Sequence, residues 1–231
     1  EELRRLRSMG LTPIPKFNFS CAHNAWMQEY GNMVGTQVYE DFCADIIRET
    51  IEIFDKPEFF HLGLNDENAD YQKYYPVKIV RSAPEKTQAA LRLFAVCLEQ
   101  GVRPWIWADV KTIEEFGGKK KFQENIPKEV LISNRCRMGV RRVEGEEMPG
   151  TALYHELDEW GYEQVPTCHR WNWKYNVKET LRYCKEYVSD EGIRGYMISS
   201  WLLTVPDYYY GLLFDADLFC EAKELIYPEE M

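Results

Sequence analysis

Two adjacent carboxylates, Asp66 and Glu67, follow the short and mostly apolar run 59–64 and come directly after Asn65. A run that ends in polar groups in this way is typical of a buried parallel strand that delivers side chains to a pocket. In an extended backbone neighbouring side chains point to opposite faces, so one carboxyl can face a cleft while the other orients a substrate group or tunes its neighbour. The same residues also suit a helix N-cap, and their spacing alone leaves both interpretations open.

Polar and aromatic side chains also gather after the other predicted strands. They are Asn18 and His23, Trp107 and Asp109, Asn134 and Arg135, His169, Trp171 and Trp173, and Trp201. Because the strands of a βα-barrel end at one mouth, this placement predicts a single pocket. We expect His23 to line that pocket rather than to bind a metal, since no second histidine stands at ligand spacing. The sequence predicts neither a metal site nor a cofactor.

The elements that must hold these residues alternate between strands and helices. Apolar residues at helical spacing predict a helix over 38–54, and a second is expected over 84–100, with Pro84 in its first turn and Gly101 just past its end. Strands are expected over 11–19, 58–63, 102–107, 130–133, 164–168 and 193–200, and further helices over 151–160 and 176–188. Loops are expected over 117–121, 138–150 and 208–210.

This alternation implies right-handed crossovers and a parallel sheet. No GxGxxG or P-loop motif opens a helix, which disfavours a doubly wound open sheet. Six strands are predicted where a (β/α)8 TIM barrel has eight. We therefore predict one partial TIM-barrel domain over residues 1–231, lacking the first two βα units. Residues 1–9 have the pattern of a helix end, so the chain is expected to start inside a larger domain.

Composition limits the partners that this chain can have. Its 28 Lys and Arg stand against 38 Asp and Glu, a net charge of 28 − 38 = −10, which argues against general nucleic-acid binding. No apolar run approaches the roughly 20 residues that span a bilayer, so no membrane partner is predicted. The seven cysteines lack CxxC spacing and are expected to be reduced thiols. The N-terminus does not have a signal-peptide pattern, and both cytoplasm and periplasm stay open.

Four stretches, taken in order, resemble the family-20 glycoside hydrolases, the β-N-acetylhexosaminidases, and in particular a divergent bacterial branch of that superfamily. These stretches are 10–23, 60–67, 105–109 and 195–201. The most specific of them is the second, which carries a His-x-Gly-x-Asp-Glu type signature at a strand end. The likeness extends over nearly the whole chain, from the third barrel strand to the eighth.

The resemblance implies a barrel catalytic domain that removes terminal N-acetylhexosamine from a carbohydrate substrate with retention of configuration. The acetamido carbonyl of the sugar attacks its own anomeric carbon, so no carboxylate nucleophile is needed. Carried over to this chain, Glu67 is the general acid and base, and Asp66 orients the acetamide. The implied substrate-binding residues are Asn65, His23, Trp107, Asp109, Trp171, Trp173 and Trp201. Each of these tryptophans would otherwise fill the core, and Asp109 would otherwise pair with a buried arginine.

The sequence departs from the family pattern at two places. One extra residue separates Gly63 from the Asp–Glu pair, and an alignment without a gap puts Asn65 and Asp66 at the family's Asp and Glu positions. A bulge after Gly63 would restore the pair of Asp66 and Glu67. Leu202 also stands where the family has a polar Glu after its last tryptophan.

These departures keep two alternatives open. One is a catalytically weakened barrel that binds carbohydrate. The other is a retaining glycosidase that uses two carboxylates, which needs a second acid such as Asp109 about 5 Å from the first. The sequence leaves the sugar, the linkage and the oligomeric state open.

Overall fold

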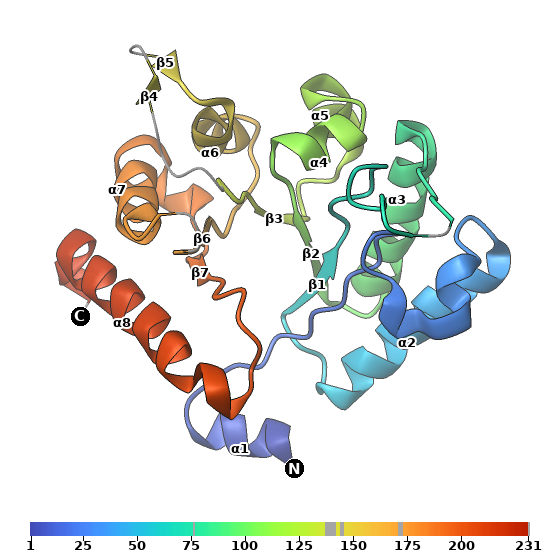
Figure 1. Ribbon diagram of the computed structural model, residues 1–231, viewed down its shortest axis with the longest axis horizontal. Helices are drawn as coiled ribbons and strands as arrows, with labels where there is room; N and C mark the ends of the chain where they lie inside the picture. The colour runs from blue at the N-terminus through green and yellow to red at the C-terminus, as the bar shows by residue number, and fades with distance from the viewer. Residues whose placement is uncertain (76, 137–141, 144–145, 171–172, 231) are drawn as a thin grey trace. The chain divides into compact units, whose positions relative to one another are not determined.

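The structure, a computed structural model, describes residues 1–75, 77–136, 142–143, 146–170 and 173–230. The chain divides into two compact units. The first comprises Glu1–Trp107 and Lys111–Leu131, and the second comprises Ala108–Val110 and Ile132–Met231. Both units combine helices with parallel strands (Figure 1), which confirms the predicted α/β class. Among the described residues no closed eight-stranded barrel is found.

Two parallel strands and two long helices form the centre of the first unit. β1 (Phe59–Gly63) pairs with β2 (Arg103–Trp107), and α3 (Ala83–Glu99) packs against β2 and against α2 (Gln37–Ile53). These four elements confirm the predicted strands and helices over this part of the chain. The remaining elements are α1 (Glu2–Ser8), η1 (Ala25–Asn32), α4 (Val110–Glu115) and α5 (Lys119–Asn125), followed by β3 (Leu131–Ser133), along which the chain passes into the second unit.

The long helices begin and end at recognisable sequence signals. Thr36 caps α2 by accepting a hydrogen bond from the Tyr39 backbone N–H at 3.3 Å. Ser82 and Glu85 form a capping box at the start of α3. Gly101 follows α3 with a φ of +73°, a left-handed conformation that glycine adopts without strain. The positions of both helices were therefore readable from local sequence.

β1 and β2 are buried along almost their whole length, as expected for parallel strands covered on both faces. Their register pairs His61 with Trp105 and then Gly63 with Ile106, which leaves Leu62 as an extra residue. This bulge lies before Gly63, whereas the shifted alignment calls for one after it.

The expected strand over 11–19 is an extended segment that runs parallel to β1. The Phe17 N–H donates to the His61 carbonyl at 3.0 Å, and the Phe19 N–H donates to the Leu62 carbonyl at 3.2 Å. Its first half forms no regular ladder, because Pro13 and Pro15 have no N–H to donate. The segment nevertheless brings residues 18–23 to the end of β1.

The second unit has shorter strands and three helices. β6 (Thr167–Cys168) pairs in parallel with β7 (Met197–Ile198), and single bridges join Gln164 to Ile132 and to Ile193. The strands expected over 164–168 and 193–200 are therefore present, but each is shorter than expected. The other elements are β4 (Arg142–Val143), β5 (Glu146–Glu147), α6 (Pro149–Glu159), α7 (Asn176–Tyr187), η2 (Asp190–Gly192), η3 (Pro206–Tyr208), α8 (Tyr209–Ile226) and η4 (Pro228–Glu230).

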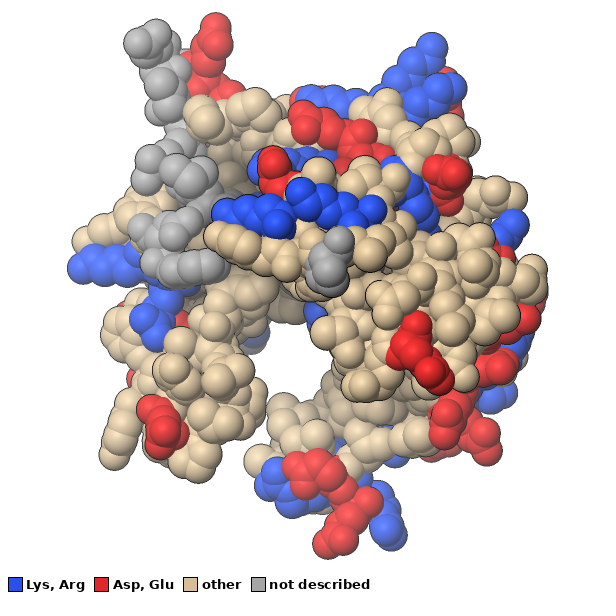
Figure 2. All heavy atoms as spheres, turned by 45° about the vertical axis from the view of Figure 1, so that its right-hand side comes forward, with Lys and Arg blue, Asp and Glu red and all other residues tan. Residues whose placement is uncertain are grey.

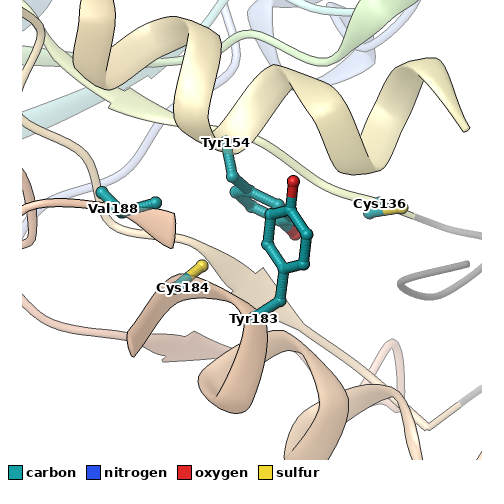
Figure 3. Close-up of a cluster of buried hydrophobic side chains, with 5 residues drawn as sticks. All are labelled: Cys136, Tyr154, Tyr183, Cys184 and Val188. Carbon is teal, nitrogen blue, oxygen red and sulfur yellow. The ribbon is translucent and has the colours of Figure 1, made fainter. Parts of the chain in front are cut away.

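A buried cluster holds α6 and α7 together in the second unit (Figure 3). Tyr154 comes from α6, and Tyr183 comes from α7 with its ring centroid 6.2 Å from that of Tyr154. Cys136, Cys184 and Val188 complete the cluster. The helices expected over 151–160 and 176–188 are confirmed, because their apolar faces have this shared core to bury.

Three of the expected loops contain regular structure. α5 begins at Lys119 because Gly118, at a φ of +89°, ends the turn and lysine is a good helix former. α8 begins at Tyr209, inside the expected loop 208–210. Ala222 of α8 belongs to a buried cluster, against which Phe219 and Ile226 pack. Leu213, Phe214 and Leu225 of the same helix are exposed, so its apolar residues do not form a single stripe that would reveal a helix. The stretch 138–150 contains the antiparallel pair of β4 and β5 among its described residues.

Acidic and basic side chains are interspersed over the described residues of the face shown in Figure 2. All seven cysteines are free; six are buried and Cys220 is exposed. No helix in the described part of the chain has the length and hydropathy to cross a bilayer. Within the same residues, no group of three or more His, Cys, Asp or Glu side chains is arranged to hold a metal ion.

Candidate functional site

The backbone turns sharply where β1 ends. Gly63 has a φ of +74°, and a Cβ atom at this position would lie 2.2 Å from Asn18 Oδ1, so only glycine fits. Leu64 and Asp66 also adopt left-handed conformations, with φ of +64° and +61°, which cost energy for residues other than glycine. The segment is therefore not extended as the sequence suggested, and tertiary contacts decide where each side chain lies.

A chain of hydrogen bonds joins Asn18, Asn65 and Asp66. Asn18 Oδ1 accepts from the Leu64 N–H at 3.2 Å, while Asn18 Nδ2 donates to Asn65 Oδ1 at 3.1 Å. Asn65 Nδ2 in turn donates to Asp66 Oδ2, and His23 Nε2 lies 3.4 Å from that same oxygen. Asn65 and Asp66 are buried, whereas the His23 side chain is 42% exposed. A carboxyl beside an imidazole that water can reach is suited to proton transfer.

Glu67 lies in a separate cluster of buried charges. Arg81 Nη2 lies 2.6 Å from Glu67 Oε1, and Lys86 Nζ lies 3.6 Å from Oε2. Lys86 also pairs with Glu115, which accepts a hydrogen bond from Asn68 Nδ2 at 3.0 Å. The side chains of Glu67 and Lys86 are 0% and 1% exposed. Two acids and two bases thus compensate one another inside the first unit.

Cys21 completes the surroundings of Glu67. Its thiol donates to Glu67 Oε1 at 2.6 Å, and its backbone N–H donates to the same oxygen at 3.4 Å. Burial raises the pKa of the Cys21 thiol, and the charge of Glu67 raises it further. Burial by itself raises the pKa of Glu67, but the charges of Arg81 and Lys86 lower it below the ordinary value of 4.5. Glu67 is therefore an ionised hydrogen-bond acceptor at neutral pH.

His61 on β1 and Trp107 on β2 pack against each other close to the end of β1. His61 Nδ1 accepts from the Gly63 N–H at 3.1 Å, so it serves as an acceptor. The His61 ring lies between two tryptophans, with its centroid 4.9 Å from that of Trp105 and 4.7 Å from that of Trp107. Trp107, which the resemblance makes a substrate-binding residue, is only 4% exposed. Its ring packs against that of His61, as a tryptophan that fills the core would do.

In the second unit, Asp109 and Trp201 both contact Arg135. Arg135 Nη2 donates to Asp109 Oδ2 at 2.9 Å, so Asp109 has the buried arginine partner that the sequence allowed for. The Arg135 guanidinium carbon lies 5.9 Å from the Trp201 ring centroid, within cation–π range. Trp201 is 47% exposed and has a φ of +55°. An exposed aromatic face held beside a fixed cation is suited to contact a ligand.

The two other predicted tryptophans give less information. Trp173 contacts Tyr175 edge to face, with ring centroids 5.8 Å apart. Trp171 lies outside the described residues. The structure thus brings Asn65, Asp66 and His23 together in the first unit, and Asp109 and Trp201 together in the second.

Sequence reasoning missed Arg81, Lys86 and Glu115 as partners of Glu67. Lys86 offered a signal, because it stands on the apolar stripe of its helix, four residues before Ala90 and seven before Leu93. A lysine at such a position needs a buried counter-charge. Arg81 offered none, since it lies in a segment with no periodic pattern.

Comparisons with known proteins show similarity of fold. A Flavobacterium johnsoniae chitobiase is similar with a TM-score of 0.62 and 12% identity, covering 95% of this chain and 37% of that chain. Two structures of pneumococcal StrH, one of them named as an exo-β-D-N-acetylglucosaminidase with tandem family-20 catalytic modules, are similar at 14% identity. Their TM-scores are 0.56 and 0.55, with 96% of this chain and 61% and 62% of theirs covered. The chain therefore spans less than two thirds of the length of each. No protein-family model and no curated protein sequence matches it.

Proposed function

We propose that this chain is the glycosidase-like part of an enzyme that removes terminal N-acetylhexosamine from a carbohydrate by retaining, substrate-assisted hydrolysis. The observation that carries the proposal is the Asn65–Asp66 pair at the end of β1, with His23 beside it. The fold supports it, because chitobiase and the pneumococcal exo-β-D-N-acetylglucosaminidase are similar in fold over nearly all of this chain. The resemblance of the sequence to the family-20 glycoside hydrolases supports the same chemistry.

In this proposal Asp66 is the proton donor and acceptor. It would protonate the leaving glycosidic oxygen, then accept a proton from the water that opens the oxazoline intermediate. Asn65 would orient the acetamido group, because an amide has two N–H donors and two acceptor lone pairs and its present bonds use one of each. Asp66 thus regains from this water the proton that it gave to the leaving oxygen, and His23, with Nε2 3.4 Å from Asp66 Oδ2, would hold the carboxyl in place.

Glu67 is the other carboxylate that the resemblance allows in the acid role. A general acid must carry its proton near the working pH, which a carboxyl with a lowered pKa does not. Its charged partners are the cations Arg81 and Lys86, and its side chain is 0% exposed. These observations support Asp66 over Glu67 as the acid.

A second candidate function follows from Asn65 itself. A neutral amide cannot stabilise a developing positive charge as a carboxylate does. A chain with Asn65 in that position would bind the sugar and turn it over slowly or not at all. This is the carbohydrate-binding alternative, and it uses the same residues at the end of β1.

The test measures hydrolysis of para-nitrophenyl N-acetyl-β-glucosaminide and of the galactosaminide. We expect Asp66→Asn to lower kcat by about a hundredfold or more. Asp45→Asn, at an exposed position on α2, is the matched control and should leave kcat unchanged. Glu67→Gln should lower kcat less than Asp66→Asn does.

Three other results would change the assignment. Loss of activity in Glu67→Gln, with Asp66→Asn only weakened, would move the acid to Glu67. Equal losses in Asp66→Asn and Asp109→Asn would favour a glycosidase with two carboxylates. Sugar binding by calorimetry without any turnover would favour the carbohydrate-binding function.

A further inference from the structure

Glu67 lies where two loops of the candidate site meet, residues 18–23 and residues 64–68. It follows Asp66 directly, and its Oε1 atom accepts two hydrogen bonds from Cys21, which stands two residues before His23. Asp66 and His23 are also the two side chains that approach each other to 3.4 Å. One carboxylate oxygen therefore ties together the two segments that carry the proposed proton-transfer groups.

The same carboxylate is fixed to the helical part of the first unit. Arg81 Nε and Nη2 donate to Glu67 Oε1 at 2.9 and 2.6 Å, one residue before the cap of α3. Lys86, in the first turns of α3, bridges Glu67 to Glu115 at the end of α4. Because these charges are buried, each has a large energetic cost if its partner moves away. Glu67 and its two cations, Arg81 and Lys86, form an anchor whose side chains are therefore held in fixed positions.

A third contact holds the two loops together independently of the charges. The Tyr75 hydroxyl donates to the Ala22 carbonyl at 2.8 Å. This bond joins the stretch after Glu67 to the residue between Cys21 and His23. Both sides of the Asp66–His23 contact are thus attached to the same framework.

We infer that Glu67, held by Arg81 and Lys86, is a positioning residue that fixes Asp66 against His23 for the proposed reaction. The inference rests on the proposed function for its effect on turnover. Such support matters at Asp66 because its left-handed backbone, at a φ of +61°, costs more energy than the right-handed conformation. Gly63 and Asn18 hold the segment before Asp66, and Glu67 holds the segment after it. Reactions of this kind depend steeply on such placement.

The first test neutralises the anchor without leaving a lone buried charge. The double variant Glu67→Gln/Arg81→Gln removes one charge of each sign and keeps the pair of Lys86 and Glu115. We expect kcat to fall by about tenfold to a hundredfold, while KM changes by less than about threefold. The single variant Arg81→Lys keeps a positive charge beside Glu67, so its kcat should lie between that of the double variant and that of the parent protein.

The matched control is a second carboxylate–guanidinium pair of the same unit. Arg92 on α3 pairs with Glu40 on α2. Arg92→Gln/Glu40→Gln should keep kcat within about twofold of the parent protein, because the ion pair that it removes includes none of Asp66, Glu67 and His23. A kcat as low in this control as in the anchor variant would overturn the inference, since any lost ion pair would then have the same effect.

The second test reads the anchor without turnover. Cys21 is 3% exposed, and iodoacetamide labelling mapped by mass spectrometry should find it slow in the parent protein, with exposed Cys220 as the fast reference. In Glu67→Gln/Arg81→Gln the Cys21 thiol loses its charged acceptor while the Tyr75–Ala22 bond remains, and Cys21 should label at least about tenfold faster. Unchanged labelling would overturn the inference, even if kcat falls.

The two proposals can fail separately. If the parent protein hydrolyses neither substrate, the proposed function fails, and the anchor is judged by Cys21 alone. Faster Cys21 labelling with an unchanged kcat would show that the anchor exists and does not position Asp66, which also overturns the inference. Faster labelling together with a lower kcat and a nearly constant KM supports it.

Discussion

One carboxylate–guanidinium pair in each unit follows a buried strand, and the surroundings of the two pairs differ. Glu67 and Arg81 are 0% and 9% exposed and have Lys86 beside them. Asp109 and Arg135 are 12% and 2% exposed, and Arg135 also faces the half-exposed ring of Trp201. The same pair of side-chain types thus serves as internal framework in one unit and as the support of an exposed aromatic in the other. The neighbours of each pair, and not its residue types, separate the two roles: a second buried cation lies beside Glu67, and an exposed aromatic ring lies beside Arg135.

The comparison predicts that Arg81→Gln will have the largest effect on stability. It leaves Glu67 without its closest cation in a place that water does not reach. Breaking a buried pair by removing one partner costs about 3–5 kcal/mol. Urea unfolding followed by circular dichroism measures the loss. A loss no larger than that of Arg135→Gln would contradict the distinction drawn between the two pairs.

Acid should lower the free energy of unfolding by less than Arg81→Gln does. Protonation removes the charge of Glu67 but leaves its oxygen atoms in place for hydrogen bonding. The folded-state pKa of Glu67 lies below its ordinary value of 4.5, so ionisation stabilises the fold. That contribution is complete above the ordinary pKa and is lost as the pH falls through the lowered one.

Urea midpoints between about pH 6 and about pH 3 test this point. The parent protein should lose more stability over that range than Glu67→Gln, which has no carboxyl to protonate at that position. Equal pH dependence in the two proteins would mean that Glu67 does not have a lowered pKa.

Arg135→Gln should have a smaller effect, about 1–3 kcal/mol. Water can partly hydrate Asp109 once its partner is removed, because that side chain keeps 12% of its surface exposed. The Trp201 ring should also lose its fixed neighbour, so acrylamide should quench tryptophan fluorescence more strongly than in the parent protein. Unchanged quenching would show that Arg135 does not hold the ring.

Arg182→Gln should have the smallest effect and sets the baseline for the comparison. Arg182 pairs with Glu179 at 2.7 Å on the surface of α7, where the two side chains are 48% and 30% exposed. Exposed helix pairs of this kind contribute about 0.2–0.5 kcal/mol. The same urea experiment measures it. A loss above about 1 kcal/mol would mean that exposure does not rank these pairs.

Local sequence predicted the elements that have local signals. The helices α2 and α3 were readable because caps, periodic apolar residues and a terminal glycine all agree. β1 and β2 were readable as short buried runs. α8 was not, because its apolar residues lie on several faces of the helix, with Leu213, Phe214 and Leu225 exposed, and because it begins within a run of tyrosines. Propensity without an apolar stripe does not define a helix.

For the site, the sequence by itself determined that carboxylates and an amide follow β1 and that His23 belongs near them. It also determined the chemical types available, since Asn65, Asp66 and Glu67 are adjacent whatever the fold. Only the tertiary structure decided which carboxylate meets which partner. Left-handed backbone at Leu64 and Asp66 breaks the alternation of an extended chain. The cations beside Glu67 come from a segment 14 or more residues further along, so packing brings them there and no local pattern can.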